Sequence, residues 1–174
     1  MRMTPRVLIV ASKYLPEYTG AAHRIHTLYK NLSDAAVPSV VCGGIERRAA
    51  ETYEQDGIPV TRLADRSSAA TGGRLMRAVH FYRDFIAAWR AISVRSFDVL
   101  HIVGTSAITS AAYYYGLWHK VPMIVELVTS GASSRLPLPG LARLIFWRPH
   151  HRTVYVAISE PLADKCQREK RGDY

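Results

Sequence analysis

The sequence of 174 residues predicts an α/β fold: a single doubly wound parallel sheet of about six strands with helices on both faces. Three observations predict this class. Short β-branched runs alternate with longer amphipathic segments, the sequence contains no internal repeat, and 48% of the residues are apolar while 21% are charged. The length suits one domain. Right-handed crossovers favour the strand order 3-2-1-4-5-6, with strands one and four at the centre.

Strands are expected where β-branched and apolar residues concentrate. In chain order these segments are Arg6–Ala11, Val40–Cys42, Ile58–Leu63, Ser96–Val103, Met123–Val128 and Thr153–Ile158. Helices are expected where apolar residues recur at helical spacing. These segments are Gly20–Asp34, Arg47–Gln55, Arg74–Arg95, Ala107–Lys120, Leu141–Trp147 and Ser159–Lys170. Asp56-Gly57 predicts a turn, 66–73 a linker, and the Ser, Gly and Pro residues of Thr129–Pro139 an irregular loop. We expect the apolar stripe of Arg74–Arg95 to be buried on the sheet.

Composition excludes several classes of protein. Cys42 and Cys166 form no C-x-x-C pair, which disfavours a disulfide framework or a cysteine zinc site. Val7–Ala11 is too short for a secretory signal, so we expect a cytoplasmic protein. The uncharged stretch Val99–Trp118 contains too many Gly, Ser and Thr residues for a membrane span, and we interpret it as a strand, a turn and a helix.

The charge is unevenly distributed. Of the net charge of +9, most comes from residues 67–158, which hold ten basic and three acidic residues. Such an excess suits a polyanionic partner, although a merely basic soluble surface is the more common explanation. The sequence contains no zinc-finger spacing, RNP-like motif or basic helix-turn-helix, so nucleic-acid binding is not expected.

The loop after the first strand, Ser12 to Arg24, is the most informative segment. It lacks the G-x-G-x-x-G fingerprint, which disfavours a nicotinamide or flavin dehydrogenase. Instead it ends at the start of a helix, where free N–H groups attract an anion and a glycine lets a ligand approach the backbone closely. We therefore expect this segment to bind phosphate, through Thr19, Gly20, Ala21, His23 and Arg24.

Four segments, in order, resemble the N-terminal half of family 4 glycosyltransferases. The opening R-V-L-I-V-A-S-K-Y-L-P-E-Y-T-G-A-A-H-R resembles the first strand, loop and helix of that family, with Thr19-Gly20 in place of its Gly-Gly pair. F-D-V-L-H-I-V-G, V-P-M-I-V-E-L and V-A-I-S-E-P-L-A-D-K resemble three later motifs. The resemblance spans nearly the whole chain. It differs after the fifth strand, where Thr129-Ser130-Gly131 replaces a frequent histidine.

The resemblance implies a Rossmann-like domain that forms one half of a GT-B fold. Residues 1–174 would be the acceptor-side N-terminal domain, and the C-terminal donor-binding domain would be absent. A complete enzyme of this kind transfers a hexose from a nucleotide-sugar to an acceptor with retention and without a bound metal. It needs no cofactor, because the nucleotide-sugar is a substrate. Its partners would be the C-terminal half or a partner chain and a sugar or lipid-linked acceptor. This half would be inactive alone, and no catalytic residue is assigned.

Ligands in doubly wound sheets bind beyond the carboxyl ends of the strands, which makes the loops after strands four and five candidates for the acceptor. The acceptor-binding candidates are Gly104, Thr105, Ser106, Glu126, Thr129, Ser130 and Gly131. Glu126 lies in an apolar strand, and a buried carboxylate is costly unless it is paired. It should therefore lie near the crevice or pair with an arginine. His101 is interpreted as a satisfied structural histidine.

Two further expectations concern metals and membranes. His150-His151 is rejected as a metal site because adjacent side chains diverge, so no metal is expected. The segment Leu136–Trp147 is apolar and flanked by arginines, which suits docking on anionic lipid at the inner face of the cell membrane. The membrane-contact candidates are Leu141, Arg143, Phe146, Trp147 and Arg148.

The alternative to an enzyme half is a non-catalytic module that holds an acceptor or docks on a membrane and acts with a separate catalytic partner.

Overall fold

The structure of the protein is a computed structural model. It describes residues 4–17, 19–44, 50–64, 73–128 and 152–164. The described strands are β1 (Arg6–Ala11), β2 (Val37–Cys42), β3 (Glu51–Gln55), β4 (Ile58–Arg62), β5 (Val99–Val103), β6 (Met123–Leu127) and β7 (Thr153–Ala157). The described part of the chain contains the helices α1 (Gly20–Asn31), α2 (Arg74–Ser93) and α3 (Ala107–His119). A helical turn over 160–164 follows β7.

These strands form one sheet in the order β3-β4-β2-β1-β5-β6-β7. All neighbouring strands are parallel except β3 and β4. The six parallel strands are the six that the sequence predicts, and their order is the predicted 3-2-1-4-5-6. The chain is therefore a Rossmann-like doubly wound α/β domain, in which β1 and β5 lie at the centre and the winding direction reverses between them.

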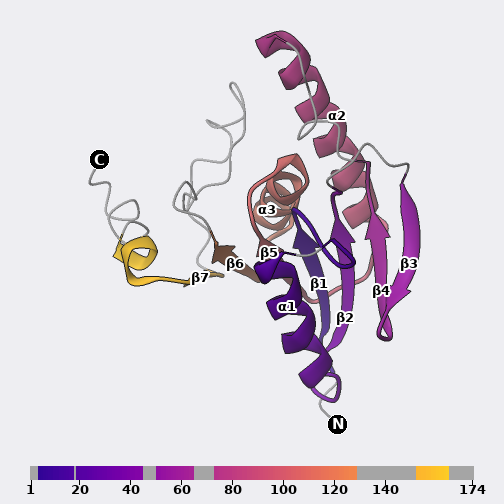
Figure 1. The fold of residues 1–174 in the computed structure, drawn as a ribbon, viewed down its shortest axis with the longest axis vertical. Helices are drawn as coiled ribbons and strands as arrows, with labels where there is room; N and C mark the ends of the chain where they lie inside the picture. The colour runs from indigo at the N-terminus through magenta and orange to yellow at the C-terminus, as the bar shows by residue number, and fades with distance from the viewer. Residues whose placement is uncertain (1–3, 18, 45–49, 65–72, 129–151, 165–174) are drawn as a thin grey trace.

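Helices cover both faces of the sheet (Figure 1). Side chains alternate along β1: Val7 and Ile9 pack in the cluster that includes residues of α1, whereas Leu8 and Val10 pack with α2 and α3 on the other face. Strands such as β1 are apolar on both faces for this reason. Val99–Trp118 forms a strand, a turn and a helix as predicted. None of the helices in the described part of the chain is long and apolar enough to span a membrane.

The helix expected over Arg47–Gln55 is wrong for residues 50–55, the part of this range that the structure describes. Residues 51–55 instead form β3, which pairs antiparallel with β4 from Glu51↔Arg62 to Gln55↔Ile58. Asp56 and Gly57 adopt positive φ values of 48° and 82°, the conformation of a two-residue hairpin turn. The predicted turn is therefore the tip of a hairpin, and the β-prone residues before it form its first strand rather than a helix.

The second strand begins at Val37 rather than Val40 and contains Pro38. Its first three residues pair with β1 only, because the pairing with β4 starts at Val40. A proline, which has no N–H to donate, is tolerated where a strand is paired on one side.

The expected burial of the α2 stripe is also wrong in its first half. The fully buried residues of α2 are Asp84, Ala88 and Ile92, which lie in its second half. Leu75, Val79, Tyr82 and Ile86 are exposed. By helical geometry these four exposed residues lie on the side of α2 opposite Asp84, Ala88 and Ile92, so the sheet-facing side of the helix is not the predicted one. The helix of 20 residues is also about 30 Å long, whereas the five-residue strands span only about 17 Å, so its beginning extends past the sheet.

Candidate functional site

The loops after β1 and β5 touch at the carboxyl edge of the sheet. The backbone N–H of Ser12 donates to the carbonyl of Val103 over 3.0 Å. Gly104 has a φ of +84°, and a Cβ at this position would lie 2.4 Å from Ser12 Oγ. Glycine is therefore required here by both conformation and packing. The two central strands thus end side by side at the predicted switch point.

The start of α1 lies at the same edge. Thr19 is the N-cap of α1, and its hydroxyl accepts a hydrogen bond from the N–H of Ala22 over 3.1 Å. The N–H groups of Gly20 and Ala21, in the first turn, have no acceptor within the helix. A Cβ at Gly20 would meet nothing within 4 Å. Packing therefore does not require glycine at position 20, in contrast to position 104.

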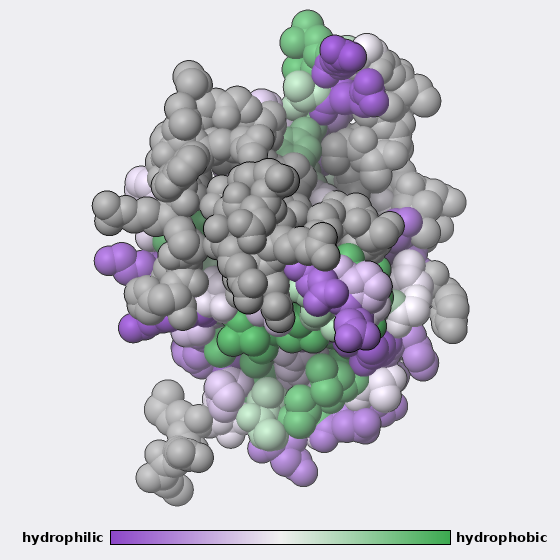
Figure 2. All heavy atoms as spheres, turned by 90° about the vertical axis from the view of Figure 1, so that its left-hand side faces the viewer, coloured by the Kyte–Doolittle hydropathy of each residue, from purple (hydrophilic) through white to green (hydrophobic). Residues whose placement is uncertain are grey.

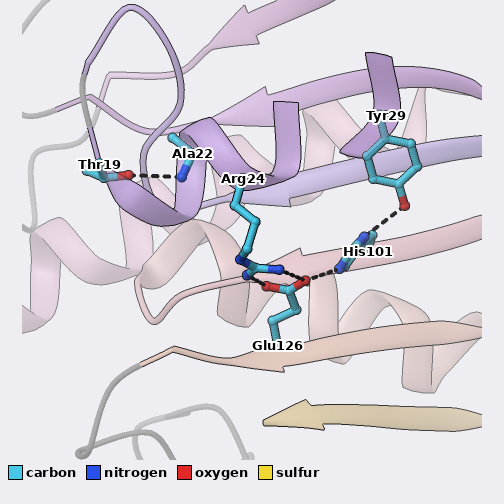
Figure 3. A network of polar contacts seen from close by, with 6 residues as sticks. All are labelled: Thr19, Ala22, Arg24, Tyr29, His101 and Glu126. Atoms are coloured by element: carbon cyan, nitrogen blue, oxygen red, sulfur yellow. Dashed lines mark hydrogen bonds and ion pairs between the residues drawn. The ribbon is translucent and has the colours of Figure 1, made fainter. Parts of the chain in front are cut away.

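An ion pair joins the first turns of α1 to the end of β6 (Figure 3). The Arg24 guanidinium holds both oxygens of Glu126: Nη1 donates to Oε1 over 3.1 Å, and Nη2 donates to Oε2. The Glu126 side chain is 3% exposed and the Arg24 side chain is 45% exposed. One predicted phosphate-binding residue and one predicted acceptor-binding residue are thus in direct contact. Of the two alternatives expected for Glu126, a place near the crevice or a pair with an arginine, the structure shows the pair with an arginine.

The Arg24–Glu126 pair continues into the core through His101 and Tyr29. His101 Nε2 donates to Glu126 Oε1 over 3.1 Å, since an ionised carboxylate only accepts. The Tyr29 hydroxyl then donates to His101 Nδ1 over 2.8 Å. His101 is buried with both ring nitrogens engaged, which confirms its interpretation as a satisfied structural histidine. The network joins α1, β5 and β6 through side chains alone (Figure 3).

The surroundings of Glu126 favour the ionised form of its carboxyl group. Burial by itself would raise the pKa of Glu126, but hydrogen bonds from His101 and Arg24 outweigh burial and hold that pKa below its ordinary value. The hydrogen bond to Glu126 raises the pKa of Arg24. Burial, with a smaller contribution from the Glu126 charge, raises the pKa of Tyr29 to about 12. Glu126 is therefore a carboxylate that holds Arg24, and Tyr29 stays protonated.

A second network of the same design also involves α1, through His26 and Lys30. The Tyr14 hydroxyl donates to His26 Nδ1 over 2.9 Å, and His26 Nε2 donates to Asp56 Oδ2 over 3.0 Å. Lys30 Nζ donates to the same Asp56 oxygen over 3.2 Å. Asp56 lies in the turn between β3 and β4, so this network ties α1 to the hairpin. Sequence analysis did not identify Tyr14 or His26; the polar residue His26 on the buried face of α1 was the available signal.

Buried Arg62 fixes the loop between β1 and α1. Its side chain is 2% exposed, and its guanidinium donates to the Glu51 carboxylate, to the Tyr53 hydroxyl over 3.0 Å and to the carbonyl of Leu15 over 3.4 Å. Tyr53 also donates to the Leu15 carbonyl, and Glu17 lies 4.0 Å from Arg62 Nε. Sequence analysis missed Arg62 and Tyr53 as well. They hold the loop that leads to Thr19.

Some of the remaining predicted binding residues lie in the described part of the chain, and others do not. Ser106 is the N-cap of α3, and its hydroxyl accepts from the N–H of Thr109 in a capping box, so this hydroxyl has a structural role. Thr105 and His23 are exposed at the edge. The loop candidates Thr129, Ser130 and Gly131 lie outside the described residues. The membrane-contact candidates Leu141, Arg143, Phe146, Trp147 and Arg148 lie outside them too.

No group of three or more His, Cys, Asp or Glu residues that could hold a metal ion occurs among the described residues. His150 and His151 lie outside them. Among the described residues, this edge of the sheet carries the backbone N–H groups of Gly20 and Ala21, the half-exposed guanidinium of Arg24 and the hydroxyl of Thr105. These groups suit hydrogen bonding to phosphate and sugar oxygens.

Comparison with known proteins identifies the fold. No family model matches the sequence, and no curated protein matches it at a significant level. A crystal structure of UDP-N-acetylglucosamine 2-epimerase matches with a TM-score of 0.58 and 14% identity over 96% of this chain and 45% of that chain. A structure described as trehalose-6-phosphate from E. coli bound with UDP-2-fluoro glucose matches with a TM-score of 0.47 and 13% identity over 70% and 32%.

These likenesses concern the fold. The chain spans less than half the length of either solved structure. Together with the mostly parallel sheet and its strand order, the match to the epimerase shows that the chain has the Rossmann-like fold of one half of a GT-B protein.

Proposed function

We propose that this chain is the N-terminal, acceptor-side half of a retaining glycosyltransferase similar to family 4, which transfers a hexose from a nucleotide-sugar to an acceptor. The observation that carries the proposal is the contact of Arg24 with Glu126. It places the first turns of α1, where a phosphate is expected, beside the end of β6, where an acceptor is expected. Both lie at the carboxyl edge of the sheet, which is where doubly wound proteins bind ligands.

On the donor side, the proposed ligand is the diphosphate of a nucleotide-sugar. The N–H groups of Gly20 and Ala21 have no acceptor within α1, and the exposed position of Gly20 leaves space for a phosphate oxygen. When the bond between the sugar C1 and the diphosphate oxygen breaks, negative charge grows on the leaving diphosphate. Donors that are already in position stabilise this charge in the transition state. Thr19 holds the first turn in place.

On the acceptor side, the proposed ligand is a sugar hydroxyl. Glu126 fixes the orientation of the Arg24 guanidinium, whose remaining N–H groups point away from the carboxylate and can donate to a hydroxyl or phosphate oxygen. Thr105 offers an exposed hydroxyl after β5. We further propose that Thr129, Ser130 and Gly131 contribute hydroxyl and N–H groups and that most of the nucleotide is held by a second GT-B half.

The proposal is tested by a screen of nucleotide-sugars on the complete protein, with extracts as acceptors and product detection by mass spectrometry. We expect one nucleotide-sugar to be consumed and a hexose to appear on an acceptor, with the anomeric configuration retained. Residues 1–174 alone should not transfer sugar. Full activity of this fragment, or no nucleotide-sugar bound or consumed by the complete protein, would refute the proposal.

Matched variants on α1 test the assigned edge. Arg24→Gln should lower transfer at least tenfold, because it removes the oriented hydrogen-bond donor that lies between the proposed phosphate and acceptor positions. Lys30→Gln is the control: it also breaks a pair between α1 and a carboxylate, Asp56, but at the hairpin end of the helix. Equal loss of activity in both variants would indicate a general disturbance of α1 rather than a site at its start.

A further inference from the structure

Helix α2 exposes an apolar stripe that runs from its first turn to Ile86. Leu75, Val79, Tyr82 and Ile86 are 81%, 44%, 43% and 48% exposed. They are spaced by four, three and four residues, so they lie along one side of the helix. A contiguous exposed stripe of this kind, unlike isolated apolar residues, marks a surface that contacts something apolar.

The stripe lies beyond the carboxyl edge of the sheet. Figure 1 shows the first half of α2 extending past the ends of the parallel strands, while its second half packs beside α3. Asp84, Ala88 and Ile92, the fully buried residues of α2, all lie in that second half. The projecting part is therefore held by the rest of the helix and presents its own surface outward.

The charge of this surface has one sign. Four arginines of α2 are exposed, at positions Arg74, Arg77, Arg83 and Arg90. The single acidic residue of α2, Asp84, is buried. By helical geometry, Arg83 and Arg90 lie within about a quarter-turn of the apolar stripe. At the top of Figure 2, where α2 projects, apolar and strongly hydrophilic side chains accordingly lie next to one another.

We propose that the projecting half of α2 docks on an anionic phospholipid bilayer. The apolar stripe would enter the boundary between headgroups and acyl chains, while Arg83 and Arg90 beside it bind lipid phosphates. A second copy of α2 would bury the stripe but would bring arginines together without an exposed acidic residue on either helix. A nucleic acid would neutralise the arginines but leave the stripe in water. A bilayer satisfies both features.

The proposal does not rest on the transferase assignment. It moves the membrane-contacting surface from Leu136–Trp147, where the sequence suggests it, to a helix whose exposure is described. Because the carboxyl edge carries the candidate site, docking through this end of α2 would bring Gly20 and Arg24 to the same side of the sheet as the lipid. An acceptor embedded in that bilayer would then be within reach of the edge.

Vesicle co-sedimentation tests this surface. The protein is mixed with phosphatidylcholine vesicles with and without phosphatidylglycerol, at low and high salt. We expect binding only to the anionic vesicles, and weaker binding in salt. The variant Leu75→Ser/Val79→Ser/Ile86→Ser should reduce the apparent affinity at least tenfold. Arg83→Gln/Arg90→Gln, which removes the two arginines beside the stripe, should also reduce the apparent affinity at least tenfold, since each arginine near an anionic surface contributes roughly fivefold.

The controls change equally exposed residues elsewhere. Val37→Ser/Val94→Ser removes two exposed apolar side chains outside the stripe, and Lys120→Gln removes an exposed positive charge. Circular dichroism and thermal unfolding verify that all variants fold. Four results would each overturn the proposal: no binding to anionic vesicles, equal loss in the controls, loss only in Phe146→Ser/Trp147→Ser, or a dimer in solution that the stripe variant abolishes.

Discussion

Replacing Glu126 by glutamine tests the central network directly. Removal of one partner from a fully buried ion pair costs about 3–5 kcal/mol. Here water replaces part of the interaction, because the Arg24 side chain is 45% exposed, and glutamine retains a carbonyl that accepts from His101. We therefore expect Glu126→Gln to lower the free energy of unfolding by about 2 kcal/mol at pH 7. For a domain of this size, that corresponds to a fall in Tm of about 4–8 °C.

The pH dependence of stability separates the effect of losing the Glu126 charge from the effect of changing the shape of its side chain. The pKa of Glu126 lies below its ordinary value of 4.5 in the folded protein, so its ionised form stabilises the fold. This contribution is fully present above the unfolded pKa and is lost as the pH falls through the folded pKa. A protonated Glu126 resembles glutamine, so the difference between the wild-type protein and Glu126→Gln should shrink at low pH.

The assay is urea unfolding followed by circular dichroism at pH 7 and at about pH 3.5. Glu54→Gln, which changes an exposed carboxylate on β3, is the matched control and should have little effect. The double variant Arg24→Gln/Glu126→Gln should lose less than the sum of its single variants, because the pair is already broken in each. Equal stability of Glu126→Gln and wild type at pH 7, or a difference that persists unchanged in acid, would refute the reasoning.

Three further changes have defined outcomes. Gly104→Ala should lower the free energy of unfolding by about 1–3 kcal/mol in the same assay, because it combines a positive φ with a clash on Ser12, whereas Gly20→Ala, with open space around it, should leave stability nearly unchanged. Arg62→Met should cost about 2 kcal/mol, and Arg62→Lys should recover little of it because an ammonium cannot reach all the same acceptors. Burial raises the pKa of Cys42 to about 12, so iodoacetamide should alkylate this thiol only after unfolding, as mass spectrometry can measure.

The sheet could be predicted because its determinants are local and repeated. Each parallel strand is an apolar run between helical segments, and the handedness of crossovers then limits the order of the strands. The hairpin strand β3 was not predicted because Glu51–Gln55 is mostly polar and exposed. The stronger signal, Asp56-Gly57, was interpreted as a turn, but the strand before it was not recognised. A two-residue Asp-Gly turn between β-prone residues predicts a hairpin.

The candidate site could be predicted only in part. The cost of burying a carboxylate predicts that Glu126 needs an arginine, but the partner, Arg24, lies 102 residues away. Nothing in the local pattern selects it from the other basic residues of the chain. The predicted burial of the α2 stripe was wrong for a related reason. Periodicity identifies the residues that share a side of a helix, but not what covers that side. By helical geometry Ile92 lies about 100° around α2 from Leu75, next to buried Ala88, and only Ile92 is buried.

The two Tyr–His–carboxylate networks also determine what the edge can offer to a ligand. They fasten α1 along its length, to β5 and β6 through Arg24 and Tyr29 and to the hairpin through His26. The N–H groups of the first turn are therefore fixed relative to the ends of the central strands. Glu126 meanwhile neutralises much of the Arg24 charge. Attraction of an anion at this edge must then come largely from the backbone N–H groups of Gly20 and Ala21, with Arg24 as an oriented hydrogen-bond donor rather than an unopposed charge.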